Sequence, residues 1–231
     1  MLLFIIKGGV GGKKYAAVNI DGVLLTDTFS DIIHDFIVEN GGIHDEDTDR
    51  SILSQPQSVA GAGMARATGN KWTAAEAISK YFEKRREVIS ITPPEVNEGV
   101  VELLELLRTC GYSLVSYGGL SIDHFYTEAG NLVEYFDNPK YICTNLIRPG
   151  IREMCDNVLK IPYSNLLVID DVARVGKEAR RLGAPFIGHP SSSKNSYQRK
   201  IMHDNDILHV TSLHEIDAAL IESVCAQASI S

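Results

Sequence analysis

The feature that most constrains this chain is a short apolar run that ends in polar residues and a glycine. Residues 15–18 read Tyr-Ala-Ala-Val, the pattern of a strand buried on both faces of a parallel sheet. Asn19 and Asp21 follow, and Gly22 then favours a sharp turn. Open α/β sheets bind ligands outside the carboxyl ends of their strands. The sequence therefore predicts a functional site at this turn.

The rest of the chain alternates strand patterns with helix patterns. Further strands are expected at residues 112–117, 141–145, 165–169 and 185–188, with a possible edge strand at 207–210. Helical patterns lie between them. This alternation predicts an α/β fold, a doubly wound parallel sheet with helices on both faces.

Residues 29–92 predict a helical insertion between the first two core strands. Helical spacing of apolar residues covers 30–39 and 73–89, whereas the Gly- and Ala-rich stretch 58–69 is expected to be a loop. Two prolines, Pro93 and Pro94, mark the end of the insertion. We therefore expect residues 1–28 and 93–231 to form the core and residues 29–92 a separate cap.

The residues before the first buried strand carry a glycine-rich segment. Residues 1–6 read as a strand, too short for a membrane span and without the basic leader of a signal peptide. Residues 7–14 resemble the phosphate-binding loop of ParA-like ATPases, but Lys14 stands where a hydroxyl is needed for magnesium. A glycine-rich hairpin turn is the expected structure.

Composition limits the possible partners. The formal net charge is −8, which argues against binding to nucleic acid or to an anionic membrane. The four cysteines show neither a CxxC motif nor zinc-ligand spacing, so they are expected to be reduced thiols of a cytoplasmic protein. A phosphorylated ligand would have to meet local positive charge.

Four polar clusters follow predicted strands in an order that resembles the motifs of the haloacid dehalogenase-like (HAD) superfamily. The four segments are Asn19-Ile20-Asp21-Gly22-Val23-Leu24, Leu114-Val115-Ser116, Arg148-Pro149 and Val168-Ile169-Asp170-Asp171. The resemblance covers nearly the whole chain. It implies a Rossmann-like core, and residues 29–92 stand where this family carries a helical cap.

The resemblance also implies a chemistry, that of a Mg²⁺-dependent phosphatase or phosphomutase acting on a small phosphorylated metabolite. Asn19 would stand in the nucleophile position and Asp21 would be the acid and base. The phosphoryl group would contact Ser116, Tyr117, Gly118 and Arg148. The Mg²⁺ ligands would be Asn19, Asp21, Asp170 and Asp171.

Asn19 departs from the family pattern, in which this position is the attacking Asp. An amide is a poor nucleophile, so the chain is expected to be inactive or impaired as a phosphatase. Natural loss of turnover, an engineered Asp→Asn change and slow deamidation of Asn19 all remain open. The alternative is a non-catalytic binding or regulatory protein; haloacid dehalogenase activity is less expected, and a nucleotide-binding ATPase least. The sequence assigns neither a substrate nor an oligomeric state.

Overall fold

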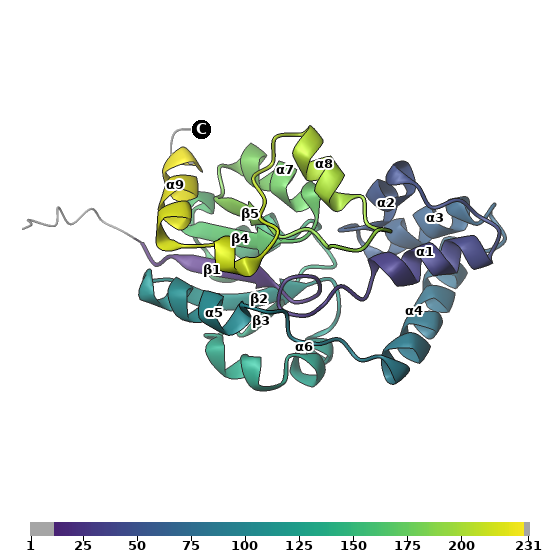
Figure 1. Cartoon of the computed structure of the whole chain (residues 1–231), viewed down its shortest axis with the longest axis horizontal. Coiled ribbons are helices and arrows are strands. Elements are labelled where there is room, and N and C mark those ends of the chain that lie inside the picture. The colour runs from purple at the N-terminus through teal and green to yellow at the C-terminus, as the bar shows by residue number, and fades with distance from the viewer. Residues whose placement is uncertain (1–11, 229–231) are drawn as a thin grey trace, which may run out of the picture.

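The computed structural model describes residues 12–228, so the expected strand at 1–6 and most of the glycine-rich segment 7–14 lie outside the described residues. Five parallel strands form one sheet in the order β3-β2-β1-β4-β5 (Figure 1). Their bounds are Tyr15–Asn19 (β1), Ser113–Gly118 (β2), Tyr141–Cys143 (β3), Leu166–Asp170 (β4) and Phe186–Gly188 (β5). The predicted doubly wound sheet is confirmed, with β1 at its centre. The possible strand at 207–210 is wrong, because that segment makes only an isolated bridge between His209 and Gly188.

Helices cover both faces of the sheet. One face packs against α5 (Val100–Thr109), α6 (Ile122–Glu128) and α9 (Ala218–Ala228), and the other against α7 (Ala173–Leu182), α8 (Gln198–Asp204) and a π-helical segment, Glu153–Leu159. Short 3-10 turns lie at Gly130–Tyr135, Tyr163–Asn165 and Leu213–Glu215. Successive strand residues point to opposite faces. Accordingly, Val18 belongs to one apolar cluster and Ala17 to the other.

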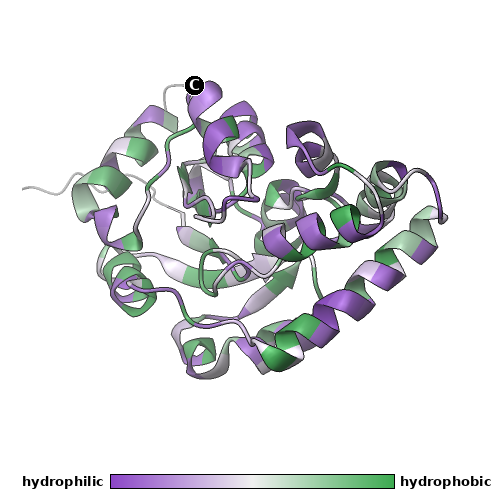
Figure 2. Cartoon of the chain, turned by 45° about the vertical axis from the view of Figure 1, so that its right-hand side comes forward, coloured by the Kyte–Doolittle hydropathy of each residue, from purple (hydrophilic) through white to green (hydrophobic). Residues whose placement is uncertain are grey.

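Four helices between β1 and α5 form the inserted region. They are α1 (Ser30–Glu39), α2 (Glu46–Ile52), α3 (Gln57–Ala67) and α4 (Ala74–Ile91), and they lie together at one end of the molecule (Figure 1). Hydrophobic and hydrophilic residues alternate along α4 (Figure 2), as expected for a helix with one buried face. The four helices share an apolar cluster of their own, which supports the proposed boundary at residues 29–92. No described helix is long and apolar enough to cross a membrane.

The helix α3 corrects the expectation of a loop at residues 58–69. Its glycines lie where neighbouring helices approach closely. A Cβ added at Gly61 would lie 2.2 Å from the carbonyl oxygen of Ala74, and one at Gly63 would lie 2.7 Å from Oγ of Ser51. The low intrinsic helix propensity of glycine is thus outweighed by tight packing against α2 and α4.

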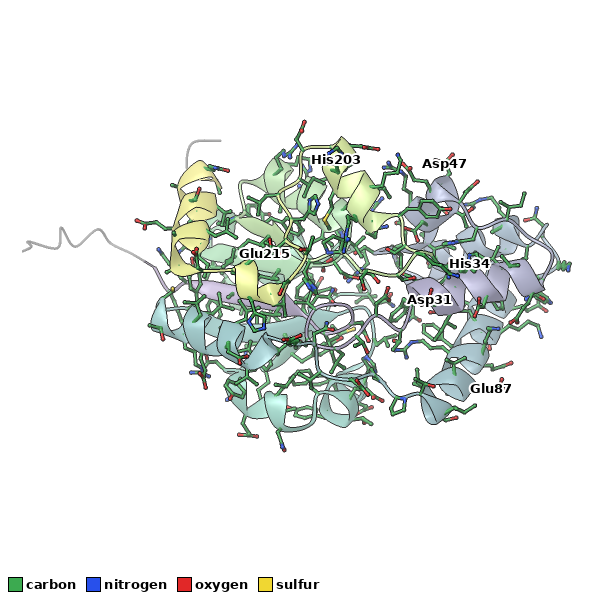
Figure 3. All side chains as sticks on the ribbon, viewed as in Figure 1. Asp31, His34, Asp47, Glu87, His203 and Glu215 are labelled. Carbon is green, nitrogen blue, oxygen red and sulfur yellow. The ribbon has the colours of Figure 1, made fainter. Side chains whose placement is uncertain are left out.

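A buried hydrogen-bond chain fastens this cap to the core. Gln198 on α8 donates from Nε2 to the Asp49 carboxylate on α2 at 2.5 Å, and its Oε1 accepts from the backbone N–H of Ala173 at 2.9 Å. Both Gln198 and Asp49 are buried. Nearer the surface, Asp31 on α1, labelled in Figure 3, accepts from Ser193 and Asn195 in the loop that precedes α8. These contacts hold the cap against the segment that follows β5.

We predict that Gln198→Leu destabilises the protein by about 1–3 kcal/mol, because it leaves the buried Asp49 carboxylate without its hydrogen-bond donor. Urea unfolding measures the loss. Lys200→Met is the matched control, since Lys200 joins the same two helices through an exposed ion pair with Glu46. A loss no larger for Gln198→Leu than for Lys200→Met would contradict the role given to this chain of hydrogen bonds.

Candidate functional site

Three side chains form a row across neighbouring strands at the carboxyl edge of the sheet. Tyr117 on β2 pairs with Asn19 on β1. Asp170 on β4 follows Ile169, which pairs with Val18, the residue before Asn19. Asn19 donates from Nδ2 to Oδ2 of Asp170 at 2.7 Å, and the Tyr117 hydroxyl donates to the same oxygen. The other oxygen of Asp170 accepts from the backbone N–H of Val172 at 2.7 Å. Both carboxylate oxygens of Asp170 therefore have donors.

Burial defines the electrostatics of this row. Asp170 and Tyr117 are fully buried. Burial and the neighbouring Asp170 raise the pKa of Tyr117 well above its ordinary value, so its hydroxyl keeps the proton that it donates. Burial also raises the pKa of Asp170, whereas the hydrogen bonds from Tyr117, Val172 and Asn19 act in the opposite direction. These three hydrogen bonds offset the free-energy cost of burying a carboxylate at this position.

Asp171, the second acid of the pair, follows β4 and lies against the turn after β1. A Cβ added at Gly22 would lie 2.4 Å from Oδ2 of Asp171, and the φ of Gly22 is +91°. Only glycine fits this turn without strain. Burial, followed by the charges of Asp170, Asp27 and Asp21, raises the pKa of Asp171 well above its ordinary value. The environment thus favours the protonated acid.

Asp21 is held between a cap residue and a core residue. Nε2 of His124, on α6, lies 3.0 Å from one carboxylate oxygen of Asp21 and 3.1 Å from the other. The guanidinium of Arg85, on α4, lies 3.4 Å from Asp21 and donates to the Thr28 hydroxyl at 2.7 Å. It also stacks over the ring of Phe29 at 4.5 Å from the ring centre. Arg85 is only 4% exposed, so this ion pair joins cap and core in a dry environment.

Arg148 follows β3 and donates to two hydroxyls. Its guanidinium binds Thr144 at 2.7 Å in the core and Ser54 at 2.5 Å in the cap. Its buried Nε has no hydrogen-bond partner, and no carboxylate of the described residues forms an ion pair with it. Arg148 is half-buried, and a cation without an ion-pair partner at such a position is costly. The guanidinium is therefore placed to receive an anion.

Ser116 is not brought to the same place. It lies two residues before the end of β2, is fully buried, and its hydroxyl has no hydrogen-bond partner. β2 runs on to Gly118, one residue past the predicted end, so the residues that reach the strand end are Gly118 and Gly119. The one-residue extension explains why Ser116 is set back.

A cavity of about 110 Å³ lies between the strand ends and the cap. Five of the residues expected at the site line it, namely Asn19, Asp21, Gly118, Arg148 and Asp171. Tyr117, Asp170 and Ser116 are not among the lining residues. The cap therefore lies over the carboxyl edge of the sheet, and the polar strand ends face it across the cavity.

The expected Mg²⁺ ligands do not fit a metal site as they are arranged. Magnesium takes oxygen ligands at near-ideal octahedral geometry. Asp170 already accepts three hydrogen bonds, and Asn19 turns its amide nitrogen toward Asp170. Among the described residues, no group of three His, Cys, Asp or Glu side chains is placed to share an ion. The three donors therefore satisfy Asp170 without a cation.

Two residues of the site, Arg85 and His124, were not predicted from the sequence. Arg85 continues the i, i+4 spacing of the buried positions Ala77 and Tyr81 on α4, and this regular spacing could have shown that it faces inward. His124 had no such signal. It reaches Asp21 only because α6 begins directly after the turn that ends β2.

Solved structures share this fold at low sequence identity. No protein-family model matches the sequence, and no curated protein matches it either. A HAD hydrolase of family IA, variant 3, from Entamoeba histolytica has a TM-score of 0.68 at 15% identity, covering 92% of this chain and 99% of that chain. A β-phosphoglucomutase from Clostridium difficile has a TM-score of 0.68 at 14% identity, covering 95% of this chain and 100% of that chain.

A third structure is a HAD family hydrolase from Deinococcus radiodurans, solved with bound phosphate and sodium. Its TM-score is 0.57 at 17% identity, and the match covers 92% of this chain and 97% of that chain. Identities this low show the fold alone. The chain has the fold of HAD superfamily hydrolases and phosphomutases, with an inserted helical cap region.

We predict that Mg²⁺ does not raise the melting temperature of the protein, but does raise that of Asn19→Asp. In the variant two carboxylates face each other without the amide donor, which should cost about 3 kcal/mol in EDTA. A bound cation would then stabilise the folded state by mass action. Thermal unfolding in EDTA and in millimolar Mg²⁺ gives the comparison.

Asn131→Asp is the control, because Asn131 is exposed and away from the row. It should change neither the stability nor the response to Mg²⁺. A clear Mg²⁺-induced rise in the melting temperature of the unaltered protein would contradict the conclusion that the donor row leaves no metal site.

Proposed function

We propose that this protein binds a small phosphorylated metabolite in the cavity beneath the cap and has little or no phosphatase turnover. The observation that carries the proposal is the pairing at the cavity wall of a half-buried guanidinium without an ion-pair partner, Arg148, with an amide, Asn19, at the end of the central strand. The guanidinium supplies affinity for an anion. The amide removes the attacking group.

In this proposal Arg148 is the anchor of the phosphate. An arginine fork matches two phosphate oxygens at once, which a lysine cannot do. Gly118 and Gly119 bring backbone without side chains to the same wall, so a phosphate can approach closely. Asp171 is compatible with an anion in the cavity because its raised pKa favours the neutral acid. Arg148 thus supplies the local positive charge that a phosphorylated ligand needs in a chain with a net negative charge.

The proposed lack of turnover follows from Asn19. Covalent phosphoryl transfer requires a carboxylate that attacks phosphorus, and an amide does not form the acyl-phosphate. Asp21 could still act as acid and base, but His124 and Arg85 hold its carboxylate. Removal of a nucleophile costs several orders of magnitude in rate.

Natural loss of turnover is the origin that the contacts support best. Asn19 and Tyr117 donate to the same oxygen of Asp170, so two unusual residues on neighbouring strands serve one purpose. A single engineered Asp→Asn change accounts for only one of them. The cytoplasmic location expected from composition is also part of the proposal.

We predict that Arg148→Met weakens the binding of phosphate esters at least about tenfold, the loss expected for one charge-assisted contact. Isothermal titration in EDTA with a panel of small phosphate monoesters measures the affinity. Arg152→Met is the matched control, because Arg152 is exposed and pairs with Glu178 on the surface. Equal affinity for the parent protein and Arg148→Met would reject the anchor.

Phosphate release from the same panel tests the second half of the proposal. The protein should show no release above background, with or without Mg²⁺. Asn19→Asp supplies the missing carboxylate and is expected to gain Mg²⁺-dependent release. Robust turnover by the unaltered protein would show that Asn19 does not block catalysis.

A further inference from the structure

The cavity is divided into a polar end and an apolar end. Asn19, Asp21, Asp171 and Arg148 stand at the strand ends. Opposite them, the cap presents an apolar wall built from α1, α2, α3, α4 and the segments next to them. Its members include Phe29, Ile33, Leu53, Met64, Ile78 and Phe82.

Apart from Tyr81, the polar side chains that line the cavity away from the strand ends make hydrogen bonds within the protein. Ser54 accepts from Arg148, and Asn145 accepts from the backbone N–H of Gln57 at 3.0 Å. The amide of Gln57 donates to the carbonyl oxygen of Gly119 at 3.4 Å. These groups link the cap to the strand ends and leave few donors or acceptors for the hydroxyls of a sugar. A ligand hydroxyl buried against the apolar wall without a partner would be disfavoured.

The apolar wall offers one polar atom without a partner. The Tyr81 side chain lines the cavity, is 1% exposed, and its hydroxyl makes no hydrogen bond to the described residues. A buried hydroxyl of this kind is normally satisfied. A single acceptor atom on a bound molecule would satisfy it, whereas a polyol would bring several groups with nothing to meet them.

We propose that the ligand is a phosphate monoester with an apolar body, of about the size of one aromatic ring or a short branched alkyl chain, rather than a sugar phosphate. The inference rests on the proposed function, since it assigns the phosphate to Arg148 at the polar end. The cavity of about 110 Å³ also has to hold the phosphate, so it limits the apolar body to a small group. Burial of the apolar body against the cap then supplies affinity that inorganic phosphate lacks.

Isothermal titration in EDTA with phenyl phosphate, glycerol phosphate and inorganic phosphate tests the assignment. Phenyl phosphate should bind at least about tenfold more tightly than either of the others, given the apolar area of a ring. Glycerol phosphate binding as tightly as phenyl phosphate, or more tightly, would overturn the inference and leave the proposed function standing. If none of the three binds, the proposed function fails and the inference fails with it.

A pair of variants on one helix shows whether the cap wall is responsible. Ile78→Asn places an amide on the wall and should reduce the preference for phenyl phosphate to less than about threefold, while inorganic phosphate binds as before. Ile91→Asn, at an exposed position of α4, should keep the full preference. Phe82→Asn repeats the test if Ile78→Asn does not fold. An undiminished preference in a folded wall variant would overturn the inference.

Discussion

The buried carboxylate of Asp170 is the constraint on which the rest of the site depends. It lies at the end of a central strand, fully enclosed, where an unpaired charge would cost several kcal/mol. Tyr117 on β2, Asn19 on β1 and the backbone of Val172, just after Asp170, supply three donors to it. These donors satisfy the Asp170 carboxylate without a cation, and Asn19 is part of the support for its neighbour.

The cap completes the site by bringing charge and apolar surface to the same edge. Arg85 reaches from α4 to Asp21, and Ser54 reaches from the cap to Arg148. Away from the cavity, the buried contact between Asp49 and Gln198 holds α2 against α8. Because these links are largely buried, cap and core are fastened at several points around the cavity. Such an arrangement suits a site that retains its ligand.

Much of the fold could be predicted from the sequence because its strands are mostly apolar and its helices carry regular apolar spacing. The helix α3 could not, because its glycines are required by close packing that only the folded chain reveals. The positions of residues near the strand ends were predicted less well. A one-residue extension of β2 sets Ser116 back from the cavity, and the hydrogen bonds of Asn19 depend on register across three strands. Local patterns predict which residues lie near an edge, but not which neighbour each one bonds.

The most direct measurement of the central claim is the affinity of phenyl phosphate in EDTA and again in millimolar Mg²⁺, on the same preparation. If the donors of Tyr117 and Asn19 replace the cation at Asp170, the two dissociation constants should agree within about twofold. A tenfold difference would correspond to about 1.4 kcal/mol of binding free energy. Binding that requires Mg²⁺, or that tightens tenfold or more when it is added, would contradict the account.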